Sequence, residues 1–145
     1  DAMFFAYDAL PHRMSDLPAR AARAGVAVQV VEDPVTTAPY DMVVCDVPCS
    51  GSGTWRRAPD AKWRFTEDDL AQLEATQAEI LDQAKELVAP GGVLVYATCS
   101  VLHAENTAQV EWFVEEFPEW EVQWQRQFAL SEGGDGFFGA ILLKK

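Results

Sequence analysis

Two cysteines stand in short segments whose composition suits reactive turns. Cys49 lies in Asp-Val-Pro-Cys-Ser-Gly-Ser-Gly at 46–53, and Cys99 lies in Tyr-Ala-Thr-Cys-Ser at 96–100. Proline stiffens a turn, glycine lets backbone approach a ligand closely, and a thiolate is a strong nucleophile. One such cysteine alone would more often be a buried structural residue. Two of them at the ends of neighbouring strands favour a reactive site.

The spacing of the cysteines argues against other uses of a thiol. A structural zinc site needs four ligands, and neither His12 nor His103 stands at ligand spacing from a cysteine. The redox pattern Cys-x-x-Cys is not formed by Cys49 and Cys99. The glycine-rich stretch at 51–53 lacks the Lys-Ser/Thr ending of a phosphate-binding loop. We therefore expect no metal site.

Three aspartates also follow short apolar runs. These are Asp8, Asp33 and Asp46. In an open parallel sheet, ligands bind beyond the carboxyl ends of the strands, so these acids and Cys99 are expected along one edge. A carboxylate there can bind ribose hydroxyls or accept a hydrogen bond from an adenine amino group. The alternative for Asp8 and Asp33 is that they only cap helices or turns.

The elements that must position these residues alternate between apolar runs and amphipathic stretches, which predicts an α/β protein. The apolar runs predict strands over 3–7, 26–31, 42–45 and 93–97. Unbroken runs of this kind suit a parallel sheet buried on both faces. The spacing predicts helices over 14–24, 66–88 and 103–117, and antiparallel strands over 121–128 and 136–143. Thr66 is the expected N-cap of the longest helix, which the Pro-Gly-Gly stretch at 90–92 should end.

The chain has 145 residues, of which 49% are hydrophobic, so we expect a single domain over 1–145. No apolar run approaches the roughly 20 residues of a membrane span, and no secretion signal opens the sequence. Three cysteines are an odd number, which argues against a disulfide framework. These features predict a cytoplasmic protein without a membrane partner.

The net charge of −12 is a poor match to a nucleic-acid-binding protein, which should carry a basic surface. The positive charge that exists is clustered beside Cys49. The cluster consists of Arg56, Arg57, Lys62 and Arg64. Trp55 and Trp63 are interleaved with it, so phosphate-binding charge is combined with faces on which bases can stack.

Together these segments resemble the NOL/NOP/Sun family of RNA cytosine-C5 methyltransferases, and above all the bacterial Sun-type enzymes that modify small-subunit ribosomal RNA. Residues 46–53 resemble the family motif D-A-P-C-S-G-T-G, and 96–100 match its second signature. Residues 56–63 are similar to R-R-x-P-D-x-K-W, and Glu105-Asn106 and 134–138 also fit. The resemblance covers nearly the whole chain. It implies a Rossmann-like, mostly parallel methyltransferase sheet with an antiparallel C-terminal hairpin.

The resemblance also implies roles for individual residues. Cys99 would add to carbon 6 of cytosine and make carbon 5 nucleophilic enough to accept a methyl group from S-adenosylmethionine. Cys49 would assist the later release of Cys99, and Asp46 would contact the cytosine ring. Asp8 would bind the ribose hydroxyls of the cofactor, and Asp33 would lie near its adenine. Cofactor binding is thus implied for Asp8, Asp33, Asp46 and Pro48, and RNA binding for Arg56, Arg57, Lys62 and Arg64.

The glycine-rich cofactor loop of the family does not occur upstream of Asp8 in this sequence. The resemblance therefore predicts that the chain is the C-terminal part of a catalytic domain without the first strand. The strands that end at Asp8 and Asp46 would then lack a shared neighbour, and exposed edges invite pairing with another chain. We expect such a fragment to bind the cofactor weakly or not at all, and to self-associate unless its edges are capped otherwise.

Two alternatives stay open. In DNA cytosine methyltransferases the nucleophile stands in the Pro-Cys motif, which would make Cys49 the attacking residue. In a non-catalytic fragment or scaffold, the chain would only bind RNA or a partner chain.

Overall fold

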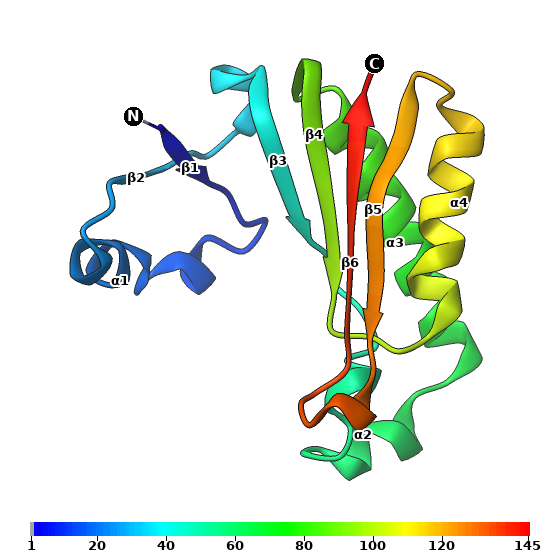
Figure 1. The fold of residues 1–145 in the computed structure, drawn as a ribbon. Helices are drawn as coiled ribbons and strands as arrows, with labels where there is room; N and C mark the ends of the chain where they lie inside the picture. The colour runs from blue at the N-terminus through cyan, green and yellow to red at the C-terminus, as the bar shows by residue number, and fades with distance from the viewer. Residues whose placement is uncertain (1) are drawn as a thin grey trace. The chain divides into compact units, whose positions relative to one another are not determined.

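The computed structural model describes residues 2–145, which form two compact units (Figure 1). The first unit ends at Ala38, and the second is Pro39–Lys145. In the first unit, two short parallel strands are paired, β1 (Phe4–Ala6) and β2 (Val28–Val30). Helix α1 (Leu17–Ala24) lies between them in the sequence and ends at Gly25, whose φ of 69° is left-handed. Glycine adopts this conformation without steric cost.

Helix α1 begins later than the sequence predicted. The expected start was residue 14, but Pro11–Met14 form a separate 3-10 turn and the helix starts at Leu17. Pro18 therefore falls in the first turn, where a missing backbone N–H costs no hydrogen bond. The proline marks the beginning of the helix rather than a weak point inside it.

The second unit is built on a four-stranded sheet with the order β3-β4-β6-β5. Its strands are β3 (Tyr40–Asp46), β4 (Val88–Thr98), β5 (Trp120–Phe128) and β6 (Phe137–Lys144). β3 and β4 are parallel, and β6 is antiparallel to both β4 and β5. The predicted α/β sheet with an antiparallel C-terminal hairpin is confirmed.

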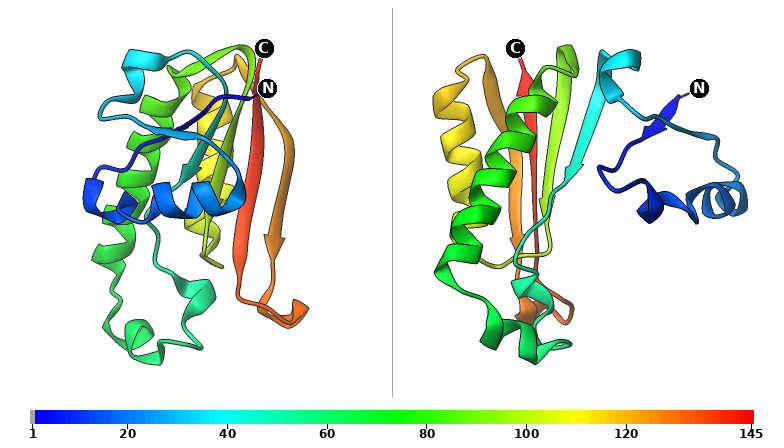
Figure 2. Two further views of the ribbon diagram at one scale, coloured as in Figure 1. Left: turned by 90° about the vertical axis from the view of Figure 1, so that its left-hand side faces the viewer. Right: turned by 180° about the vertical axis from the view of Figure 1, so that it is seen from behind.

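Three helices accompany this sheet, namely α2 (Pro59–Arg64), α3 (Glu67–Lys85) and α4 (Thr107–Glu116). α3 and α4 cover one face of the sheet (Figure 2). Side chains alternate along β4, so that Leu94, Tyr96 and Thr98 point into the layer under these helices and are buried. The core there includes Leu81 of α3 and Phe113 of α4. The short helix α2 was not predicted from the sequence.

Helix α3 starts where the sequence predicted and stops earlier. Thr66 accepts a hydrogen bond from the Asp69 N–H, and the Asp69 carboxylate accepts from the Thr66 N–H in return. The helix ends at Lys85, because Val88 is buried as the first residue of β4. The expected end at 88 was therefore wrong. The Pro-Gly-Gly stretch lies within the strand, where the register shifts between the Tyr40–Val88 and Met42–Val93 pairs.

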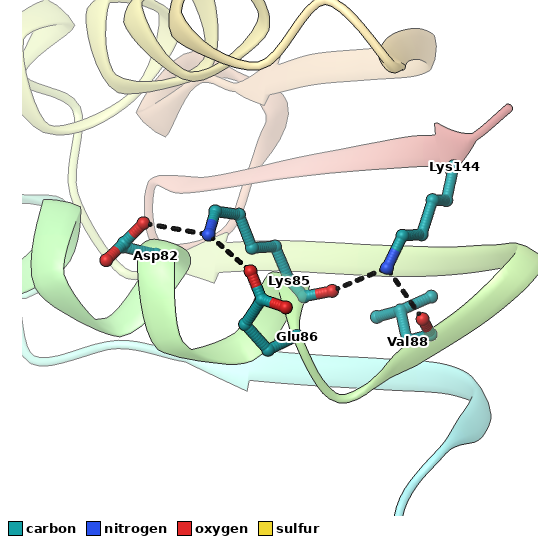
Figure 3. Close-up of polar contacts among 5 residues, drawn as sticks. All are labelled: Asp82, Lys85, Glu86, Val88 and Lys144. Carbon is teal, nitrogen blue, oxygen red and sulfur yellow. Dashed lines mark hydrogen bonds and ion pairs between the residues drawn. The ribbon is translucent and has the colours of Figure 1, made fainter.

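Lys144 joins the last strand to the C-terminal end of α3 (Figure 3). Its Nζ donates to the carbonyl oxygens of Lys85 at 3.0 Å and Val88 at 2.9 Å. Carbonyl groups at a helix C-terminus lack partners within the helix, and a cation is favoured there. Lys85 points elsewhere and pairs with Asp82 at 3.0 Å and Glu86 at 2.7 Å.

Lys144→Met should destabilise the protein. Methionine keeps the apolar length of the side chain but leaves two carbonyl oxygens without their donor, so the free energy of unfolding should fall by about 2 kcal/mol. Urea denaturation followed by circular dichroism measures the change. The neighbouring Lys145 has an exposed side chain, and Lys145→Met should change the stability by less than about 0.5 kcal/mol. Equal effects of the two substitutions would contradict the role of Lys144.

Within residues 2–145, β1, β2, β3 and β5 each have a strand partner on one side only. β1 pairs only with β2, and β3 pairs only with β4 in this part of the chain. These are the edges that the resemblance predicted to lack a neighbour, and self-association through them stays a prediction. No helix of residues 2–145 is long and apolar enough to cross a membrane.

Candidate active site

The two cysteine segments meet at the carboxyl ends of β3 and β4. The parallel ladder continues past β3 through a hydrogen bond from the Val47 N–H to the Ala97 oxygen, at 3.2 Å. The Gly53 N–H then donates to the Cys99 oxygen at 3.0 Å, which holds the loop after Cys49 against the end of β4. As a result, the Cys49 and Cys99 sulfur atoms lie 3.4 Å apart. The predicted pairing of the two thiols at one sheet edge is confirmed.

Cys49 and Cys99 are both half-buried and neither is in a disulfide. Burial, together with the smaller effect of the adjacent Cys99 sulfur, raises the pKa of Cys49 to about 12. Cys49 therefore remains a protonated thiol near neutral pH. Its S–H can donate a hydrogen bond to a thiolate at Cys99, which is the form that attacks an electrophile.

The loop after Cys49 is packed against the turn between β5 and β6. The Gly136 N–H donates to the Gly53 oxygen at 2.9 Å. A Cβ atom at Gly53 would lie 1.9 Å from the Gly136 oxygen and 2.9 Å from the Cys99 oxygen. Only glycine fits this position, because backbone atoms surround it and cannot rotate away.

The basic cluster is partly neutralised within the molecule. Arg56 and Arg57 both pair with Asp135, at 3.3 and 2.5 Å, while remaining more than half exposed. Arg64 pairs with Asp60 one turn earlier in α2 at 2.6 Å. The Lys62 Nζ lies 5.8 Å from the Trp63 ring centroid. RNA binding by these residues stays a prediction.

The two tryptophans of this region differ in surroundings. Trp63 is 82% exposed, and the adjacent Lys62 is also exposed. Trp55 packs on Phe65 with ring centroids 5.6 Å apart, and its Nε1 donates to the Ser50 oxygen at 3.2 Å. Trp55 therefore supports the Cys49 loop, whereas Trp63 is the ring suited to base stacking.

The predicted cofactor residues fall in both units. Asp46 is exposed at the end of β3, and the Pro48 oxygen accepts from Gln77 Nε2 at 2.9 Å, so both lie in the segment that leads to Cys49. Asp8 and Asp33 lie in the first unit. Each accepts a hydrogen bond through Oδ1 from the backbone N–H two residues later, at 2.7 and 2.9 Å. One carboxylate oxygen of Asp8 and one of Asp33 therefore cap a turn, as the alternative interpretation expected. The cofactor role of both residues stays a prediction.

Sequence reasoning assigned no role to the polar side chains behind the cysteines. Glu105 and Gln77 are completely buried there, together with Ser100 and Asn106. One signal was present in the sequence. Gln77 stands at helical spacing between Leu73 and Leu81 on the face of α3 that packs on the sheet, where an apolar residue is expected. A polar residue at such a position must find buried partners.

Residues 1–142 match the family model described as 16S rRNA methyltransferase RsmB/F. The chain belongs to the RsmB/F family. It is similar to "Ribosomal RNA small subunit methyltransferase B" of Salmonella arizonae, with 44% identity over 114 residues, and to the protein of the same description from Salmonella paratyphi B, with 43%. Each match covers 73% of this chain and 27% of the relative, so the chain spans about a quarter of the length of these relatives.

Solved structures agree with this family on the fold. A methyltransferase homolog protein from Pyrococcus horikoshii matches all of the chain with a TM-score of 0.84, at 24% identity and over 54% of its own length. NSun6 from Pyrococcus horikoshii with SFG matches 99% of the chain with a TM-score of 0.85, at 22% identity and over 42% of its own length. The RsmB/F chain therefore has a Rossmann-like methyltransferase fold, as its sequence predicted.

Proposed function

We propose that this RsmB/F chain carries the catalytic cysteines of a methyltransferase that acts on carbon 5 of a cytosine in small-subunit ribosomal RNA. The observation that carries the proposal is the 3.4 Å contact between Cys49 and Cys99 at the ends of two adjacent parallel strands. The names of the curated relatives support ribosomal RNA as the substrate class.

In the proposed reaction, the Cys99 thiolate forms a bond to carbon 6 of the cytosine. The electron pair of the 5,6 double bond makes carbon 5 nucleophilic, and carbon 5 takes the methyl group. A base then removes the carbon-5 proton, the double bond re-forms, and the carbon 6–sulfur bond breaks to release Cys99. In this proposal Asp46, which is exposed at the end of β3, accepts a hydrogen bond from a protonated ring nitrogen that draws charge from the adduct.

Cys49 assists this release as a hydrogen-bond donor. Because burial holds its pKa near 12, the thiol is protonated at neutral pH and can stabilise the departing Cys99 thiolate across 3.4 Å. The same raised pKa makes Cys49 a poor nucleophile, since attack requires the thiolate. This property argues against Cys49 as the attacking residue of a DNA-type mechanism, and the family resemblance assigns the attack to Cys99.

S-adenosylmethionine would supply the methyl group from its sulfonium, and each unit separately offers acceptors of the kind that this cofactor needs. Asp8 uses Oδ1 for the Leu10 N–H, and its second carboxylate oxygen can accept from a ribose hydroxyl. Asp8 also lines a surface cavity of about 240 Å³ within the first unit. Asp33 can accept from the adenine amino group in the same way, and Asp46 and Pro48 would form the loop beside the reacting centre.

The test is methyl transfer by a protein of the relatives' length that carries these 145 residues. Incubation with S-adenosylmethionine labelled in its methyl group and with small-subunit ribosomal RNA should yield 5-methylcytosine, identified by nuclease digestion and mass spectrometry. Label on a ring nitrogen or on the ribose would contradict the proposal. Failure of labelled S-adenosylmethionine to crosslink under ultraviolet light would instead support a non-catalytic, RNA-binding role.

A further inference from the structure

Glu105 occupies the centre of the buried region behind the two cysteines. Its side chain is completely buried, and none of the ion pairs found within residues 2–145 involves it. Oε1 accepts from the Ser50 N–H at 2.7 Å and from Gln77 Nε2 at 3.1 Å. Oε2 accepts from the Ser50 hydroxyl at 2.6 Å and from the Ser100 hydroxyl. Each carboxylate oxygen therefore has two donors.

The partners of this carboxylate have a specific relation to the reactive residues. Ser50 directly follows Cys49 in the sequence, and Ser100 directly follows Cys99. One side chain thus holds the residue after each cysteine, although the two cysteines lie 50 residues apart in the chain. The backbone of Glu105 is also held in place, because the Tyr96 hydroxyl donates to its carbonyl oxygen at 2.6 Å.

A carboxylate suits this position better than any neutral side chain. Burying a charge without an ion-pair partner is costly, and hydrogen bonds from several donors are needed to offset the cost. An ionised carboxylate is an acceptor only and can take about four hydrogen bonds, which is the number found here. A glutamine would put an NH2 group in place of one oxygen, so that the two serine hydroxyls would have to reverse and accept, and the charge that strengthens all four bonds would be lost.

We infer that Glu105 is the positioning residue of the cysteine pair, which joins the loop after Cys49 to the segment after Cys99 and so keeps the two sulfur atoms in contact. The geometric part of this inference is independent of the reaction. Its catalytic meaning, that the contact sets the rates of attack and release at Cys99, rests on the proposed function.

The competing explanation is that Glu105 only stabilises the packing of α3 and α4 on the sheet. Gln109 provides a matched control for that role. It is buried in the same helix interface, and its Nε2 donates to the Glu74 oxygen at 2.9 Å and to Gln77 Oε1 at 3.4 Å. Both of these bonds are to α3 and neither is to a cysteine segment, so Gln109→Met should lower stability without moving the sulfur atoms.

The test measures how readily the two sulfur atoms join. In a Cys45→Ala background only Cys49 and Cys99 carry thiols, and reaction with oxidised glutathione gives one intramolecular disulfide and two molecules of reduced glutathione. The equilibrium yields the effective concentration of one thiol at the other. Glu105→Gln should lower this value by about tenfold or more, the effect of losing one charge-assisted hydrogen bond. Gln109→Met should change it by less than about twofold.

Ser50→Ala keeps the experiment decisive if Glu105→Gln does not fold. It removes the hydroxyl bond to Oε2 and keeps the N–H bond to Oε1, so the effective concentration should fall by a smaller factor, about threefold. An effective concentration within about twofold of the parent in every one of these variants that folds would overturn the inference, whatever the activity.

Kinetics then separate the inference from the proposed function. In an active protein, Glu105→Gln should lower kcat with KM for RNA nearly unchanged, because the side chain is buried behind the thiols and does not reach the substrate. Gln109→Met should leave both constants near the parent values. If the parent transfers no methyl group but the effective concentration falls in Glu105→Gln, only the proposed function fails. If KM rises and kcat does not change, the positioning role is wrong.

Discussion

Replacing Cys99 with alanine is expected to abolish methyl transfer and the covalent RNA complex, whereas replacing Cys49 with alanine is expected to let that complex accumulate. Cys99→Ala removes the atom that bonds to carbon 6, so the rate should fall by at least about 1,000-fold. Cys49→Ala leaves the attacking sulfur in place and removes the thiol 3.4 Å away that stabilises it as a leaving group. Attack then continues while release becomes slow.

Both outcomes are visible on a denaturing gel. A labelled RNA that contains the target cytosine, incubated with S-adenosylmethionine, should migrate as a protein–RNA complex only with Cys49→Ala. The third cysteine provides the control. Cys45 is buried in the core, and Cys45→Ala should leave the rate within about twofold of the parent. A complex that forms with Cys99→Ala and not with Cys49→Ala would identify Cys49 as the nucleophile.

The second large effect is expected at Gly53. A Cβ atom there would approach the Gly136 carbonyl carbon to 2.6 Å and its oxygen to 1.9 Å, so Gly53→Ala must push the β5–β6 turn away from the Cys49 loop. The hydrogen bonds from Gly53 to Cys99 and from Gly136 to Gly53 would be strained together. We expect the free energy of unfolding to fall by about 3 kcal/mol, near the upper end of overpacking effects.

Urea denaturation with tryptophan fluorescence measures this loss. Gly134 belongs to the same turn, and a Cβ atom on it would meet no atom within 4 Å. Gly134→Ala should therefore be neutral to within about 0.5 kcal/mol. If both variants unfold at the same urea concentration as the parent, the close packing of the turn on the Cys49 loop is wrong. Gly53→Ala should also lower the effective concentration of the Cys49 and Cys99 thiols for each other, because the strained contacts include the bond between Gly53 and Cys99.

The strands and the cysteine pair could be predicted because their signals are local. Each apolar run ends at a polar residue that marks the edge of the sheet, and the two cysteines stand at the ends of runs that pair with each other. Helix α3 could be predicted to begin after Thr66, because its capping partners are three residues apart. Its end was mistaken because Val88 continues the helical spacing of Leu81 and Ala84, and only packing in the sheet shows that it belongs to β4.

The buried polar cluster and the neutralised arginines depend on contacts that no local pattern reveals. Glu105 meets Ser50 across 55 residues of chain, and Arg56 meets Asp135 across 79. From the sequence alone, a single glutamate at the start of a helix is expected to be exposed to solvent. Its burial becomes apparent only when the loop after β3 and the segment after β4 are placed together.

The order of strands along the chain has a consequence for synthesis on the ribosome. β6 comes after β5 in the sequence, yet it lies between β4 and β5 in the sheet. Within residues 2–145, β5 pairs only with β6, so a nascent chain that ends at Phe128 presents Trp120–Phe128 without a neighbouring strand. At about 5–20 residues per second, this interval lasts on the order of a second. The sheet of the second unit can therefore be completed only after Phe137–Lys144 has been made, because this strand pairs with both β4 and β5.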